Sequence, residues 1–155
     1  MKILFDVSAL QPKYLHPDAL YSLNLYRLLR GLGIDIDPVF QLTKGVKENF
    51  INHHINGSAK KFYSFFAQKG AIFHGPSGDL LIESEKFTKV ISVNDLSMFH
   101  DGLLDPKRMT VLQKHLKNQF HKNPAAILVP ANSVRNEILV KFPKFVDKVH
   151  VVQPG

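Results

Sequence analysis

The sequence contains no cysteine. A chain without thiols has no disulfide framework, no thiol nucleophile and no cysteine-ligated zinc site. It also lacks long apolar runs. The hydrophobic stretch that opens the chain ends at Asp6, well short of the roughly 7–15 residues of a signal-peptide core or the roughly 20 of a membrane span. The sequence therefore predicts a cytoplasmic protein, with peripheral contact at the inner membrane face left open.

Motifs for phosphate and metal binding are absent as well. No G-x-G-x-x-G follows the first predicted strand, and no G-x-x-x-x-G-K-[ST] occurs, which disfavours a dinucleotide site and excludes a P-loop nucleotidase. His53 and His54 are adjacent, so they would project in different directions from a helix or a strand and do not suit a shared metal ion. We expect no metal and no cofactor.

The charge balance is basic, with a formal net charge of +7. An anionic partner such as nucleic acid, anionic lipid or a phosphorylated substrate would suit this charge, and so would a plain solvated lysine surface. Arginine, which reads bases and clamps phosphates best, occurs only at positions 27, 30, 108 and 135. Nucleic-acid binding is therefore the least favoured of these interpretations.

The 155 residues, 45% hydrophobic and 21% charged, suit one globular domain. Strands are predicted at 2–7, 35–42, 71–74, 89–93, 125–129 and 148–152, and helices at 18–32, 106–122 and 132–142. The first helix is indicated by regularly spaced leucines: Leu25, Leu28, Leu29 and Leu32. Two short helices are expected between 46 and 68, separated near 56–58. Alternating strands and helices predict an α/β fold, a Rossmann-like three-layer α/β/α sandwich with a mostly parallel sheet.

The predicted helix at 106–122 is amphipathic. An apolar stripe is made by Met109, Leu112, Leu116 and Phe120. The opposite side is basic and carries Lys107, Lys114, Lys117 and His121. This basic side is either a solvated outer face or a surface for anionic lipid headgroups or a phosphorylated carrier.

Polar side chains follow four of the predicted strands. They are Asp6 and Ser8, then His74 and Ser77, then Asn94 and Asp95, and finally Asn132 and Ser133. Ligands of open parallel sheets bind beyond the carboxyl ends of the strands, where the strand order reverses. As a set, these eight residues predict a substrate-binding site.

Each of these residues also has a structural explanation. Asp6 could accept hydrogen bonds from loop amides, and His74 could be a buried, hydrogen-bonded histidine. Asp95 could hold the next loop through an Asx turn. Asn132 or Ser133 could simply cap the following helix.

At these positions the sequence resembles the N-terminal domain of family 4 glycosyltransferases, which have the two-domain GT-B architecture. The resemblance runs along nearly the whole chain. It rests on the order and spacing of the segments at 5–10, 73–77, 93–99, 129–133, 136–139 and 148–155, which read FDVSAL, FHGPS, VNDLSMF, VPANS, NEIL and KVHVVQPG.

The resemblance implies a hexosyltransferase-like enzyme that transfers a sugar from a nucleotide-sugar donor with retention of the anomeric configuration. The acceptor, a glycan or a lipid-linked sugar, would lie on this domain, while the donor would be held by a C-terminal domain. We expect residues 1–155 to form a single acceptor-side domain without that donor-binding domain, which would join it in cis or in trans. No catalysis is expected from the isolated domain.

Two departures from the family pattern fall at the expected site. Asn94 stands where the family usually has a histidine, and an amide cannot exchange a proton near neutral pH. The stretch His16 to Tyr21 contains no glycine where the family has a glycine-rich loop. We therefore assign no catalytic residue, and we retain a degenerate, non-catalytic module that binds a glycan or lipid carrier as the alternative.

Overall fold

The structure is a computed structural model that describes residues 2–11, 17–41, 46–62, 70–79, 86–100 and 102–153. Within these ranges the N-terminal half contains β1 (Ile3–Asp6), α1 (Pro17–Gly31), β2 (Ile36–Phe40), α2 (Glu48–Ile55), β3 (Lys60–Lys61) and β4 (Ile72–Gly75). The C-terminal half contains β5 (Thr88–Ser92), the 3-10 helix η2 (Ser97–Phe99), α3 (Pro106–His121), β6 (Ala126–Val129), α4 (Asn132–Lys141), η3 (Pro143–Phe145) and β7 (Val149–Val151).

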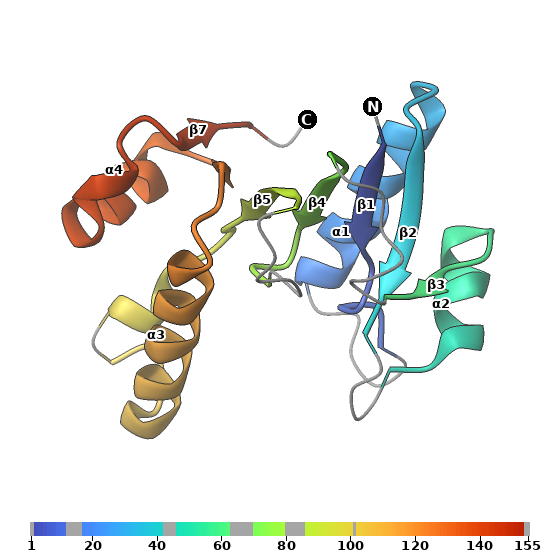
Figure 1. Ribbon diagram of the computed structural model, residues 1–155. Helices are drawn as coiled ribbons and strands as arrows, with labels where there is room; N and C mark the ends of the chain where they lie inside the picture. The colour runs from blue at the N-terminus through green and yellow to red at the C-terminus, as the bar shows by residue number, and fades with distance from the viewer. Residues whose placement is uncertain are drawn as a thin grey trace.

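All seven strands join one parallel sheet in the order β3-β2-β1-β4-β5-β6-β7. The order runs outward from β1 to β3 in one direction and from β4 to β7 in the other. Figure 1 shows α1 and α2 grouped with the first three strands, and α3 and α4 grouped with β5 to β7. The predicted Rossmann-like α/β/α fold is therefore confirmed.

The pleat of the sheet divides the core into two layers. Successive side chains of a strand point to opposite faces. Leu4 of β1 accordingly belongs to a cluster that includes Leu116 and Phe120 of α3, whereas its neighbour Phe5 belongs to a cluster with Leu23 and other residues of α1. Helices α3 and α4 thus cover one face of the sheet, and α1 and α2 cover the other.

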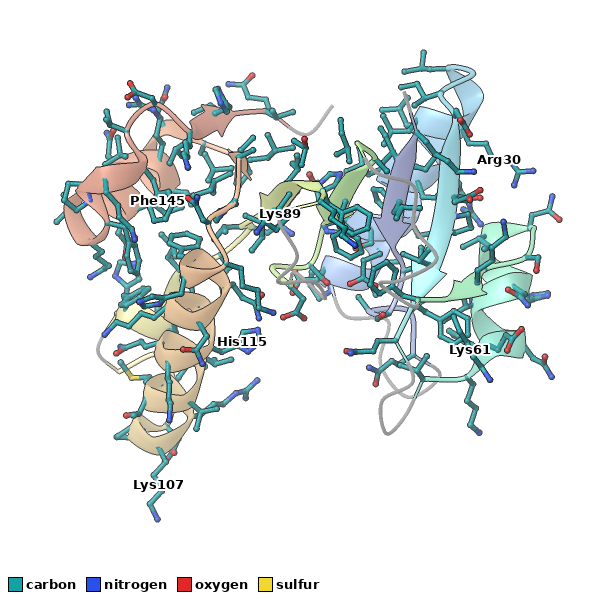
Figure 2. The ribbon with its side chains drawn as sticks, viewed as in Figure 1. Arg30, Lys61, Lys89, Lys107, His115 and Phe145 are labelled. Atoms are coloured by element: carbon teal, nitrogen blue, oxygen red, sulfur yellow. The ribbon has the colours of Figure 1, made fainter. Side chains whose placement is uncertain are left out.

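Aromatic side chains pack against one another on the face of the sheet that α3 and α4 cover. The ring of Phe120 lies 4.8 Å from that of Phe142 and 5.0 Å from that of Phe145, both in edge-on arrangements. Figure 2 shows Phe145 between α4 and the upper end of α3. These contacts hold α3 in a fixed position beside the sheet, so that its free side can form the wall of a site.

Helix α1 forms as predicted, but its leucine series marks the buried face only in part, because Leu25 and Leu29 pack against the core and the other two leucines do not. Leu28 and Leu32 are 60% and 68% exposed. The buried side is made by Ala19, Ser22, Leu23 and Tyr26. Small and polar residues fit where the helix lies close to the sheet, and a sequence pattern that counts only large apolar residues misses that face.

Three other local predictions change. Strand β3 at Lys60–Lys61 stands where the second short helix was expected to begin, and the rest of that prediction, from residue 63 on, lies outside the described ranges. Helix α4 has Ala131 as its N-cap with no side-chain cap bond, so neither Asn132 nor Ser133 is a cap. The predicted loop after β5 contains η2, and η3 was not predicted.

Gly33 ends α1 in a backbone conformation that residues with a Cβ rarely adopt. Its φ is +75°, whereas Gly31, two residues earlier, is helical, and both have open space around an added Cβ. We expect Gly33→Ala to lower the free energy of unfolding by about 1–2 kcal/mol, because a Cβ is strained in the left-handed region. Gly31→Ala is the matched control and should be neutral or stabilising. Urea denaturation of both variants checks this, and equal stabilities would contradict it.

Candidate functional site

The strand order reverses between β1 and β4. Parallel hydrogen bonding places the carboxyl ends of both strands, and of β5 beside them, at one edge of the sheet. In open parallel sheets a ligand-binding crevice lies at this edge, where the strand order reverses. The polar residues predicted at the ends of β1, β4 and β5 all lie along this edge of the sheet.

A cavity of about 310 Å³ opens at this edge, between the loops after β4 and β5 and the helix α3. Its polar lining includes Asp18, Ser77, Asn94, Asp95, Arg108 and His115. Apolar lining comes from η2, the loop before α3 and α3 itself: Met98, Leu104, Leu112 and Leu116. Three predicted residues, Ser77, Asn94 and Asp95, are brought together here.

Asn94 connects three parts of the cavity. Its amide nitrogen donates to Oδ1 of Asp18, at the start of α1, at 3.2 Å, and to the backbone oxygen of Pro76, after β4, at 3.3 Å. Both partners are acceptors only, so the nitrogen must face them and Oδ1 of Asn94 points elsewhere. That oxygen has no hydrogen-bond partner within the described ranges, and it can accept from a ligand.

Asp95 is committed to the loop that follows it. Its Oδ1 accepts from the backbone N–H of Ser97 at 2.7 Å, and its Oδ2 accepts from the Ser97 hydroxyl at 2.6 Å. This is the Asx turn considered from the sequence, and it opens η2. Asp95 is nevertheless exposed and contributes a carboxylate to the cavity lining.

The α3 wall was not predicted. His115 Nε2 lies 2.5 Å from Oδ1 of Asp79, which follows β4, so this hydrogen bond ties α3 to the opposite side of the cavity. Arg108, Leu112 and His115 lie on the same side of α3. Leu112 follows Arg108 by one helical turn, and His115 follows it by two. Figure 2 shows His115 on the side of α3 that faces the middle of the molecule. The signal in the sequence was this i, i+4, i+7 series, hidden beside the stronger apolar stripe.

His74 lies behind the cavity. The side chain is 6% exposed, its ring meets Phe5 edge-on at 5.2 Å, and its Nε2 is 3.0 Å from the hydroxyl of Ser92, which borders the cavity. Burial lowers the pKa of His74 from 6.5 to about 4. The ring is therefore neutral at pH 7, and it reaches the cavity only through Ser92.

Asp6 is buried at the end of β1. Burial raises its pKa from 3.8 to about 7, although the backbone N–H of Ser8 donates to its Oδ1 at 2.9 Å. Its Oδ2 is the one buried side-chain polar atom without a hydrogen-bond partner among the described residues. Ser8 accepts from the N–H of Gln41 at 2.9 Å and so ties this turn to β2. Neither Asp6 nor Ser8 lines the cavity.

Asn132 and Ser133 stand apart from the other predicted site residues. Both are exposed at the start of α4 and are not among the cavity residues. The parallel sheet places them at the same edge, but β6 lies beyond β5 and carries them away from the reversal point. A substrate contact by these two residues stays a prediction.

The basic side of α3 faces solvent, since Lys107, Lys114, Lys117 and His121 are all exposed.

Among the described residues, no three histidine or acidic side chains are grouped closely enough to hold a metal ion. In the same part of the chain, no helix combines the length and hydrophobicity needed to cross a membrane.

Comparison with known proteins adds no identification. No protein-family model matches the chain, and no curated protein matches it significantly. The class that the fold itself defines is a Rossmann-like α/β domain with a polar cavity beside its point of strand reversal.

Asp6 makes stability depend on pH. The folded state keeps the Asp6 proton up to about pH 7, whereas the unfolded chain releases it near 3.8, so ionisation costs stability as pH rises between these values. We expect Asp6→Asn to remove a slope of up to about 1.4 kcal/mol per pH unit in that window. Urea denaturation from pH 4 to 8 measures it, with the exposed Asp147→Asn as control. Parallel pH profiles for Asp6→Asn and the wild type would refute this assignment.

His74 should affect the pH dependence of stability in the opposite direction to Asp6. Its pKa is lowered in the folded state, so the unfolded chain binds the proton first, and stability is lost as pH falls from 6.5 toward 4. His74→Gln, which can still bond to Ser92, should abolish that acid-side loss. The same denaturation series checks it against the exposed His121→Gln. An unchanged acid limb would show that His74 is not the group responsible.

Proposed function

We propose that this chain is the acceptor-binding domain of a retaining glycosyltransferase of GT-B architecture, which transfers a sugar from a nucleotide-sugar donor. The observation that carries the proposal is the cavity beside the strand reversal, where Ser77 and Asn94 stand within one lining of hydrogen-bonding groups. Such groups suit sugar hydroxyls, which both donate and accept hydrogen bonds. The segments that resemble family 4 enzymes supply two of the cavity's loops.

A donor domain in cis or in trans is part of this proposal. Electrostatic stabilisation of the departing nucleotide phosphate is usually the largest contribution to such catalysis. Among the described residues of the cavity lining, Arg108 is the only arginine or lysine, so this part of the lining has no cluster of cationic side chains for a nucleotide diphosphate. The donor would therefore bind to the partner domain, in the cytoplasm or at the inner membrane face.

The second candidate is a non-catalytic module that binds a glycan or a lipid-linked carrier. It is favoured by Asn94, whose amide is engaged by Asp18 and Pro76 and has no proton to exchange near pH 7. In this reading the cavity recognises the sugar, and the exposed lysines of α3 meet an anionic membrane surface.

A glycan array and a transfer assay test the proposal together. The purified chain should bind immobilised glycans, should not bind UDP-glucose or GDP-mannose, and should transfer no label from either. The test variant Leu112→Trp places a larger side chain in the cavity from α3. It should abolish glycan binding while the circular dichroism spectrum stays unchanged. Transfer by the isolated chain, or glycan binding that survives the filled cavity, would overturn the proposal.

A chimera separates the two candidates. The chain is joined to the donor domain of a family 4 glycosyltransferase, and activity is compared between Asn94 and Asn94→His. Activity that appears or rises with histidine indicates an eroded enzyme. Glycan binding without any transfer in either form indicates the non-catalytic module.

A further inference from the structure

We infer that the outer edge of β7 binds an extended acidic segment of a partner protein, which joins the sheet as a further strand. The inference goes beyond the proposed function, because this edge lies at the end of the sheet and not at the strand reversal. It rests on unpaired backbone groups of β7, on the lysines beside them and on exposed valines at both ends of the strand.

Among the described strands, β7 pairs only with β6. Figure 1 shows β7 at the opposite end of the sheet from β3. The backbone oxygen of Lys148 accepts from the N–H of Ile127 at 2.8 Å. Four residues later, the N–H of Val152 donates to the backbone oxygen of Val129 at 2.8 Å. Lys148 and Val152 therefore direct these backbone groups toward β6.

The residues between them alternate in direction. In a parallel ladder every second residue hydrogen-bonds to the same neighbouring strand, so His150 faces β6 as well. Val149 and Val151 then direct their N–H and C=O groups to the outer side, where no partner for these groups occurs within the described ranges. An open edge of this kind is a template for a further strand.

The opposite edge of the sheet differs from this one. Strand β3 consists of Lys60 and Lys61, both exposed. Short length and lysine side chains are two of the ways in which proteins prevent strands from adding at an edge. From 149 to 152 the β7 edge carries three valines and a histidine and lacks this protection.

The segment that contains β7 is basic. From 141 to 153 it carries three lysines and a single acidic residue, Asp147. The Nζ atoms of Lys144 and Lys148 lie 5.0 and 5.7 Å from the centre of the same aromatic ring, that of Phe145. Two positive charges are therefore close together directly before β7.

These two lysines determine which partner fits. Lys148 donates to the amide oxygen of Asn123, a neutral group, at 2.8 Å. In the described part of the chain, neither Lys144 nor Lys148 forms an ion pair with a carboxylate. A carboxylate on an added strand can approach both ammonium groups, whereas a second copy of this chain would bring its own lysines to the same place. Charge complementarity therefore favours an acidic segment over self-association.

Exposed valines flank the edge. Val146 precedes β7 and Val152 follows it, and each is 51% exposed. Aliphatic side chains of an added strand can bury this apolar surface. The partner segment that fits is therefore extended, alternates acidic with aliphatic residues, and is bound mainly through its backbone.

Peptide titration followed by nuclear magnetic resonance tests this inference on the ¹⁵N-labelled chain. The probe is an acetylated and amidated nonapeptide of alternating glutamate and valine, and two comparison peptides carry glutamine or lysine in place of glutamate. We expect the glutamate peptide to shift the N–H signals of Val149 and Val151 saturably. The glutamine peptide should bind about threefold more weakly, as exposed ion pairs are lost. The lysine peptide should bind about tenfold more weakly because its charges are repelled.

Amide hydrogen exchange gives a second measurement that needs no variant. In the free chain, the N–H groups of Val149 and Val151 should exchange faster than that of His150, which is bonded within the sheet. The glutamate peptide at saturation should slow exchange at Val149 and Val151 and leave His150 unchanged.

Variants assign the binding to the edge and to its charges. Val151→Pro removes one outward N–H and leaves the β6–β7 hydrogen bonds in place, so it should weaken the glutamate peptide by about fivefold. Val151→Ala keeps the N–H and is its control. Lys144→Gln combined with Lys148→Gln should make the glutamate and glutamine peptides bind equally, whereas the exposed Lys117→Gln on α3 should not. Circular dichroism confirms that each variant is folded.

The outcomes are distinct. A lysine peptide that binds as tightly as the glutamate peptide overturns the inference, and so do peptide-induced shifts confined to residues outside 141–153. Exchange at Val149 and Val151 that slows with protein concentration alone would show that a second copy occupies the edge, which also overturns it. The glycan array probes the cavity at the strand reversal, so its result leaves this inference unchanged in either direction.

Discussion

Parallel hydrogen bonding between β1 and β4 is the constraint on which the rest of this structure depends. Because the two strands run the same way and the strand order reverses between them, their carboxyl ends lie together at the place where open parallel sheets bind ligands. The start of α1, the loop after β4 and the loop after β5 then meet at one place. Asp18, Ser77 and Asn94, from distant parts of the chain, line one cavity there.

Much of the fold could be predicted from the sequence because its signals are local. Short apolar runs between helical segments predicted a parallel sheet, and six of its seven strands were located in advance. The two-residue β3 carries only Lys60 and Lys61 and has no apolar signal of its own. The leucine series of α1 predicted its buried face only in part, since Leu25 and Leu29 pack against the core whereas Leu28 and Leu32 are exposed.

The candidate site was only half predictable, for a related reason. The rule that ligands bind beyond strand ends finds residues that directly follow strands, and it found Ser77, Asn94 and Asp95. It cannot find a wall that packs there from another element, so Arg108 and His115 of α3 were missed. The same rule cannot tell β6 from β5, which is why Asn132 and Ser133 joined the prediction although they lie further along the edge.

Helix α3 is shared between two hollows. His115 borders the cavity at the strand reversal and also a second one of about 560 Å³, whose lining includes Gln119 and Asn123 toward the other end of the helix. A substitution at His115 would therefore alter the lining of both hollows at once. Selection acting on the specificity of either hollow is therefore not free to reshape α3 for that hollow alone, and compensating substitutions in one would be expected to accompany adaptive change in the other.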